Sequence, residues 1–241
     1  LQKGWKTYWH TPGEGGYPQT LDWKNSTNVS SLEILWPQPQ EFNILGIKSI
    51  GYENEVIFPL KIELENIHEQ SFFSFELNYL TCKEICIPGS AYLELSLPPG
   101  KGELTNHSFQ IEKYLSKIPY LNGNITGFKI LNVEASSDAD VSLIRIEAQS
   151  QSPLIDPKFF LGNELGLPVI TPQYNFSTDR KNVTAQFFYD AFIFDKNNFN
   201  LSILLIDNNV AVEYKTNVEP KIVSKLFTIN YSYIYIFLIA T

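Results

Sequence analysis

Cys82 and Cys86 are the only cysteines of this 241-residue chain, and three residues separate them. They lie in the segment Leu80–Pro88, after an alternating run that is typical of a strand and before a proline. Two thiols this close share one obvious chemistry, the opening and closing of a single disulfide. Three interpretations are open: a redox-active disulfide, a structural disulfide, and part of a metal site.

The length of the loop between the cysteines and the number of possible metal ligands distinguish the three interpretations. A bridge across so short a loop removes little entropy from the unfolded chain, so it is a weak structural staple. A zinc site needs four ligands, and only His10, His68 and His107 could join the thiols. Copper sites often use methionine, which the chain lacks. We therefore favour redox exchange, because short, exposed bridges are easily reduced, and we expect no metal.

Four residues beside the pair are candidate neighbours in the site. Lys83 would favour the thiolate form of a nearby cysteine and Glu84 would oppose it. The favoured interpretation, however, is that both side chains are solvated loop charges. Tyr79 is either a shield for the pair or a packing residue, and Pro88 closes the motif.

The composition bounds the class of protein. Hydrophobic residues make up 44% of the chain, enough to fill a core, and the many aromatic and β-branched residues favour sheet. The net charge is −8 without a cluster of Lys or Arg, which argues against a nucleic-acid surface. The chain starts at Leu1 and resembles a mature form whose leader has been removed. The lone close cysteine pair fits an oxidising compartment. We attribute the eight Asn-x-Ser/Thr motifs to an AT-rich bacterial composition.

Strand signals surround the cysteines. Phe72–Leu80 and Ala91–Leu97 both alternate between apolar and polar residues, so the cysteines are expected at the tip between two antiparallel strands. Residues 55–65 predict another strand, and residues 32–42 a short strand that ends near Pro37. Residues 3–24 predict a strand, a long loop and a second strand.

An aromatic set lies close to the N-terminus. Trp5, Tyr8, Trp9 and His10 precede a turn rich in Pro and Gly. They form a candidate groove for a peptide or sugar, although packing of the first sheet is the simpler interpretation because aromatic residues dominate cores. His10 is also a candidate proton carrier beside a thiol.

The rest of the chain predicts a helix and a second β-sandwich. Residues 109–117 have apolar residues at helical spacing before Pro119. Asp207–Asn209 is a hairpin signal. Strands are predicted at 128–134, 141–148, 183–188, 201–206 and 210–215. We therefore expect an all-β fold of two tandem β-sandwiches joined by a short helix.

The expected division of the chain has four parts. Residues 1–104 form the domain with the cysteines, 105–122 a linker with the helix, and 123–220 the second sandwich. Residues 221–241 form an apolar tail. Its uncharged part, Leu226–Thr241, is shorter than the roughly 20 residues that a spanning helix needs, and we interpret it as the start of a transmembrane segment.

Several motifs together resemble a known family. The opening Trp5–Pro18, the segments 37–42 and 51–56, and the cysteine segment 80–88 are similar, in the same order, to the periplasmic N-terminal region of ScsB-type and DsbD-like protein-disulfide reductases. The resemblance covers residues 4 to 100. DsbD-type domains have a longer loop between the cysteines, so the ScsB-type branch is more similar. The resemblance implies an immunoglobulin-like fold for the first domain.

The resemblance also implies a function. A membrane-embedded reductase domain would pass electrons to the cysteine pair, and the pair would reduce thioredoxin-like periplasmic proteins that serve cytochrome c maturation, disulfide correction or copper tolerance. By position in the family motif, Cys86 would attack the partner and Cys82 would resolve the mixed disulfide. The protein would be periplasmic and tethered through a C-terminal segment, without nucleic acid or a small-molecule cofactor. The family's membrane domain is not within these 241 residues, so transfer across the membrane would require it.

Two alternatives from other classes stay open. One is a non-catalytic binding module in which the disulfide is structural. The other is a Cu(I)-handling protein that uses both thiols as ligands.

Overall fold

The computed structural model describes residues 1–13, 15–44, 46–100, 102–122, 127–163, 166–190, 192–194, 197–208 and 210–224. The first half of the chain contains β1 (Lys6–Tyr8), β2 (Thr20–Asp22), β3 (Ser31–Ile34), β4 (Gln40–Ile44), β5 (Ile47–Glu53), β6 (Leu60–Glu63), β7 (Ser71–Cys82) and β8 (Cys86–Leu97). After helix α1 (Ser108–Leu115), the second half contains β9 (Tyr120–Leu121), β10 (Phe128–Ser137), β11 (Ser142–Ser150), β12 (Lys158–Asn163), β13 (Gln173–Phe176), β14 (Asn182–Tyr189), β15 (Phe199–Asp207), β16 (Val210–Val218) and β17 (Lys221–Ile222).

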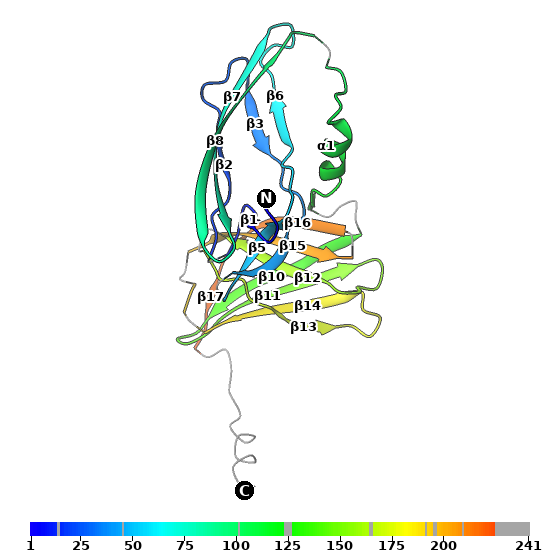
Figure 1. Cartoon of the computed structure of the whole chain (residues 1–241). Coiled ribbons are helices and arrows are strands. Elements are labelled where there is room, and N and C mark those ends of the chain that lie inside the picture. The colour runs from blue at the N-terminus through cyan, green and yellow to red at the C-terminus, as the bar shows by residue number, and fades with distance from the viewer. Residues whose placement is uncertain are drawn as a thin grey trace, which may run out of the picture.

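The long hairpin of β7 and β8 runs along one side of the first half (Figure 1). On its other edge, β7 pairs with β2 and with β1, and β5 and β4 extend the sheet beyond β1. Strands β3 and β6 form a separate two-stranded sheet. Side chains of both sheets form a common core around the buried Val29, Phe73 and Phe75. The prediction that the cysteines lie at the tip between two antiparallel strands is confirmed, because Cys82 ends β7 and Cys86 begins β8.

The second half contains two sheets that enclose a separate core. Their strand orders are β13-β14-β11-β10-β17 and β12-β15-β16-β9. Every second residue of β11 and β14 is buried, as expected for strands with one face on a core. Ile144 and Ile146 from one sheet and Ile203 and Leu205 from the other are fully buried in this cluster. The all-β prediction with β-sandwich halves is confirmed, whereas the boundaries at 104, 122 and 220 stay predictions.

The five strands predicted for the second half are all present, and β15 pairs directly with β16 through Asp207 and Val210. The predicted turn includes Asn209, which lies outside the described residues. Strands β5, β9, β12, β13 and β17 were not predicted. In β5, Gly51 lies so close to its paired strand β1 that a Cβ atom would collide with the Thr7 carbonyl oxygen. This glycine therefore marks a close approach of two strands and not a turn.

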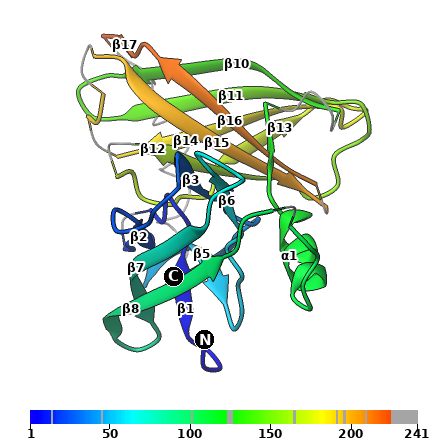
Figure 2. The same ribbon diagram turned by 90° about the horizontal axis from the view of Figure 1, so that it is seen from above.

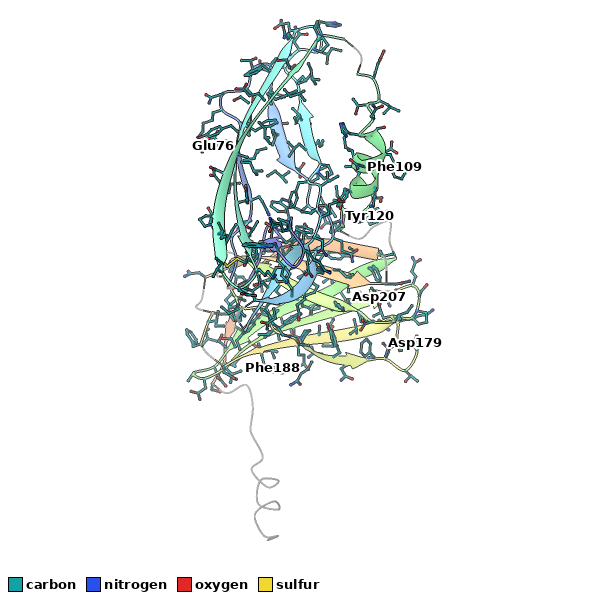
Figure 3. All side chains as sticks on the ribbon, viewed as in Figure 1. Glu76, Phe109, Tyr120, Asp179, Phe188 and Asp207 are labelled. Carbon is teal, nitrogen blue, oxygen red and sulfur yellow. A yellow bond between two sulfur atoms is a disulfide. The ribbon has the colours of Figure 1, made fainter. Side chains whose placement is uncertain are left out.

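The predicted helix is present as α1, two residues shorter at its C-terminal end. Tyr114 is its buried residue, and its hydroxyl donates a hydrogen bond to the Glu55 carboxylate at 3.0 Å. Phe109, one of the apolar residues at helical spacing, is 76% exposed and projects from α1 (Figure 3). Within the described ranges, no helix has the length and apolar character to cross a membrane. The apolar tail from Leu226 lies outside those ranges.

The two halves meet in a shared hydrophobic cluster, which we call the junction core. The first half contributes Trp9, Ile50 and Tyr52, and the second half contributes Phe160 and Leu204, with Ile206 and Ala211 completing the cluster. Seen from above, the second-half strands lie across one side of the first half (Figure 2). The second half is therefore packed onto the first through apolar side chains.

A polar pair borders the junction core. The His10 Nε2 atom lies 3.3 Å from the Glu213 carboxylate, and the His10 ring packs 3.8 Å from the Trp9 ring. The Ser202 hydroxyl donates a second hydrogen bond to Glu213 at 2.5 Å. Burial by itself raises the pKa of Glu213. The hydrogen bond and charge of His10, with the Ser202 hydroxyl and the charge of Lys215, bring this pKa below its ordinary value.

We expect Glu213→Gln to destabilise the protein by about 1–3 kcal/mol at pH 7, the usual cost of losing a hydrogen bond to a charged group. Because folding lowers the pKa of Glu213, this contribution is present above its ordinary value of 4.5 and is lost as pH falls through the folded-state pKa. Urea unfolding at pH 7 and in acid measures the difference. The exposed Glu219→Gln is the control. A loss of stability that is equal at both pH values would contradict the ion pair.

Candidate functional site

Cys82 and Cys86 form a disulfide whose two sulfurs lie in different environments. Cys82 has no solvent-exposed area and belongs to a small cluster with Tyr8, Phe42 and Ile44. Cys86, directly across the ladder in β8, is exposed. The bridge therefore joins an exposed cysteine to an enclosed one.

Strand β1 brings a tyrosine hydroxyl to the buried sulfur. Lys6 pairs with Cys82 across the strands, and the Thr7 hydroxyl donates to the Leu80 carbonyl at 2.9 Å. The Tyr8 hydroxyl donates a hydrogen bond to Cys82 Sγ at 2.9 Å, and it lies 3.9 Å from Cys86 Sγ. Burial raises the pKa of Tyr8, so the phenol stays protonated and can donate at neutral pH.

This hydroxyl can stabilise an open bridge. When the disulfide is reduced, negative charge on the Cys82 sulfur would accept the Tyr8 hydrogen bond, and hydrogen bonds to charged acceptors are stronger than those to neutral ones. The enclosed sulfur would then have a polar partner where its other neighbours are the apolar Phe42, Ile44 and Leu80. The two cysteines can therefore have different roles. Cys86 is accessible to attack, and Cys82 is held behind it by the Tyr8 hydroxyl.

The neighbours predicted from the sequence occupy the turn and the adjacent ladder. Lys83 and Glu84 are exposed in the turn, where the Lys83 amide donates to the Ile85 carbonyl at 3.0 Å. Pro88 is exposed in β8. The Tyr79 ring covers Gly89, its partner across the ladder, where a Cβ atom would come within 2.5 Å of the ring. These positions fit solvated charges at Lys83 and Glu84 and cross-strand packing at Tyr79.

Two of the four residues of the candidate groove near the N-terminus are enclosed in the structure. Tyr8 and Trp9 are fully buried, and Trp5 is half-buried. Because successive residues of a strand point to opposite faces, Tyr8 contacts the disulfide while Trp9 enters the junction core. His10 pairs with Glu213 at the border of the junction core and not with either sulfur. The packing interpretation therefore applies to Tyr8 and Trp9.

The Tyr8–Cys82 contact was not among the sequence predictions, which placed Tyr8 in the candidate groove. The two residues are 74 positions apart, and no local pattern indicates that β1 reaches the end of β7. In the described part of the chain, no group of three His, Cys, Asp or Glu side chains could hold a metal ion.

Comparisons with known proteins give a family match for the first 98 residues and a similar fold for the chain. Residues 1–98 match the family model described as thiol:disulfide interchange protein DsbD, N-terminal. The N-terminal periplasmic domain of ScsB from Proteus mirabilis superposes with a TM-score of 0.66 at 23% identity, over 91% of this chain and 84% of that one. An endo-fucoidan hydrolase of glycoside hydrolase family 107 gives a TM-score of 0.17 at 8% identity, over 93% of this chain and 29% of that one, which does not indicate a shared fold. No curated protein matches the chain.

Proposed function

Because residues 1–98 carry a domain of the DsbD N-terminal family with a closed Cys82–Cys86 bridge, we propose that the chain is a periplasmic thiol–disulfide exchange module. In this proposal it takes electrons from a membrane-embedded reductase domain and reduces thioredoxin-like partners, as in cytochrome c maturation, disulfide correction or copper tolerance. The observation that carries the proposal is the asymmetry of the bridge, with Cys86 exposed and Cys82 enclosed beside Tyr8.

The exchange follows from this asymmetry. In the reduced protein, the exposed Cys86 thiolate attacks one sulfur of a partner disulfide, and the other partner sulfur leaves as a thiolate. Cys82 then attacks Cys86 Sγ, which closes the bridge and releases the first partner sulfur as a second thiolate. Two electrons pass to the partner, and water supplies the protons that the partner thiolates take up. Cys82 is already across the ladder from Cys86, so the second step needs little movement.

We expect a redox titration of the chain in glutathione and dithiothreitol buffers to show a reversible transition within the range of exchange proteins, about −120 to −270 mV. Tyr8→Phe removes the donor to Cys82 and makes the reduced form less stable by about 1–2 kcal/mol. For two electrons this lowers the potential by about 20–40 mV. Alkylation of free thiols followed by mass measurement reports the fraction reduced.

Tyr79→Phe is the matched control, because it removes a hydroxyl from a ring that packs on Gly89, and its potential is expected to equal that of the wild type. If the reduction potential of the disulfide is below about −300 mV, the disulfide is structural and the proposal is rejected. A rise in potential for Tyr8→Phe would contradict the role given to the hydroxyl.

A further inference from the structure

The sheet β12-β15-β16-β9 turns one face toward the first half of the chain (Figure 1). This face changes character along its strands. Phe160 and Leu204, which pair across β12 and β15, lie in the junction core. Further along the same face, Gly162 pairs with Ser202, and Ser202 pairs with Lys215 of β16. The face is therefore apolar where the first half covers it and polar beyond that point.

An open cavity of about 580 Å³ lies at the polar part of this face. The second half contributes mainly polar residues to its lining, among them Gly162, Asn200, Ser202, Lys215 and Asn217. The first half contributes His10 and Thr11, which follow β1. A volume of this size is common for small-molecule sites, which span about 300–1,000 Å³. The cavity belongs to the junction of the two halves, and neither cysteine lines it.

The Thr11 hydroxyl is a buried polar group that lines this cavity. It bonds to no other residue in the described part of the chain. A Cβ atom on Gly162 would come within 2.5 Å of the Thr11 hydroxyl oxygen, so the glycine leaves this hydroxyl its space beside β12. Buried hydroxyls in proteins are nearly always hydrogen-bonded. A ligand in the cavity could supply the partner of Thr11.

The cavity is locally cationic, although the net charge of the chain is −8. Lys215 and His10 line it, and none of the described lining residues is Asp or Glu. The neighbouring Glu213 is engaged by His10 and by the Ser202 hydroxyl. Lys215 takes part in none of the salt bridges between described residues. Its ammonium group can therefore bind an anion in the cavity.

Amide and hydroxyl groups accompany this charge. Asn200 and Asn217 pair across β15 and β16, and the Asn217 side-chain amide donates to Asn200 Oδ1 at 3.1 Å. A second N–H and the side-chain carbonyl of Asn217 can still bond to a ligand. The Ser202 hydroxyl donates to Glu213 and can accept a hydrogen bond at the same time. Such groups match a ligand that carries several hydroxyls.

We propose that this junction cavity binds a small hydroxylated carboxylate of the size of a sugar acid. The Lys215 ammonium would donate to the carboxylate, and hydroxyls of the ligand would bond to Thr11 and Asn217. An apolar anion would leave these amide and hydroxyl groups unpaired, which lowers affinity. A neutral sugar would lack the charged contact, which is the strongest one available. Charge and hydroxyls together therefore define the ligand class, and thiol exchange plays no part in it.

The test uses the full chain with its disulfide closed, and D-glucuronate is the probe. Isothermal titration calorimetry is performed at neutral pH and low salt, because salt screens the attraction to Lys215. D-glucose supplies the ring without the carboxylate, and acetate supplies the carboxylate without the ring. We expect saturable one-to-one binding of glucuronate, at least tenfold tighter than binding of glucose or acetate. In an isotope-labelled sample, the backbone amide resonances of Gly162 and Asn217 should shift with occupancy.

Single substitutions separate the cavity from other sites. Lys215→Gln removes the ammonium and should weaken glucuronate binding at least tenfold. Lys221→Gln is the matched control, because Lys221 is exposed and pairs with Glu134, which does not line the cavity. Thr11→Val keeps the shape of the side chain and should weaken binding severalfold. The midpoint of urea unfolding should not fall in this variant, because the lost hydroxyl bonds to no described residue.

Four results would overturn the inference. Folded wild-type protein that shows no saturable binding of glucuronate has no site of this class. Equal affinity for glucose would identify a neutral-sugar site, and equal affinity for acetate would identify a site that recognises charge alone. Unchanged affinity in both Lys215→Gln and Thr11→Val would place the ligand outside this cavity.

Discussion

Replacing Cys82 with serine is expected to trap a partner protein on Cys86, whereas replacing Cys86 should abolish reaction with any partner. In the first variant, the exposed Cys86 sulfur can still attack a partner disulfide, but no thiol remains to resolve the product. In the second variant, the remaining thiol is Cys82, which has no exposed area. Turnover should fall to the background rate in both variants, and only Cys82→Ser should accumulate a mixed disulfide.

The measurement is the reduction of a thioredoxin-fold protein disulfide by the reduced chain, followed by non-reducing electrophoresis and mass measurement of trapped species. Thr81→Ala is the matched control, because it alters the residue beside Cys82 and leaves both thiols in place. Trapping by Cys86→Ser instead of Cys82→Ser would reverse the two roles. Full activity of both single variants would reject exchange through this pair.

Local patterns in the sequence predicted the hairpin that carries the cysteines. Alternation in Phe72–Leu80 and Ala91–Leu97 indicated both strands, and the short spacing of the cysteines placed them at the turn. The same patterns did not show that β8 is exposed along its length. Alternation reports the periodicity of a strand, and tertiary packing decides whether another element covers it.

Contacts between distant segments could not be predicted in this way. Tyr8 reaches Cys82 because β1 enters the sheet between β5 and β7, and the close approach of Gly51 to Thr7 fixes that position. The aromatic run near the N-terminus was recognised, but as a candidate groove. Tyr8 contacts the disulfide and Trp9 enters the junction core because the two side chains point to opposite faces. The face that each one takes depends on how β1 is placed in the sheet.

The junction core gives the second half a structural role that the sequence did not reveal. Trp9 is next to Tyr8 in the chain, fully buried, and packed among residues of both halves. The second half therefore supports the strand that carries the sulfur-binding hydroxyl. A spacer connected only by a linker would not share a core of this kind, because domains that move independently have more polar contacts.

We expect Trp9→Ala to lower the free energy of unfolding by about 3–5 kcal/mol, the usual cost of removing a large buried aromatic side chain. Because the cavity would lie between the halves, both should lose stability together. Urea unfolding should show one transition that moves to lower urea with its slope unchanged, followed both by near-ultraviolet circular dichroism and by tryptophan fluorescence. Phe109→Ala, which truncates an exposed aromatic residue on α1, should change stability by less than about 0.5 kcal/mol.

The shape of the transition separates a shared core from two independent domains. If the halves unfold separately, Trp9→Ala will split the curve, and the half with the cysteines will melt first while the other keeps its midpoint. A single displaced transition shows instead that the junction core couples them. In that case the enclosure of Cys82 and its contact with Tyr8 depend on side chains such as Leu204, which lie more than a hundred residues away in the sequence.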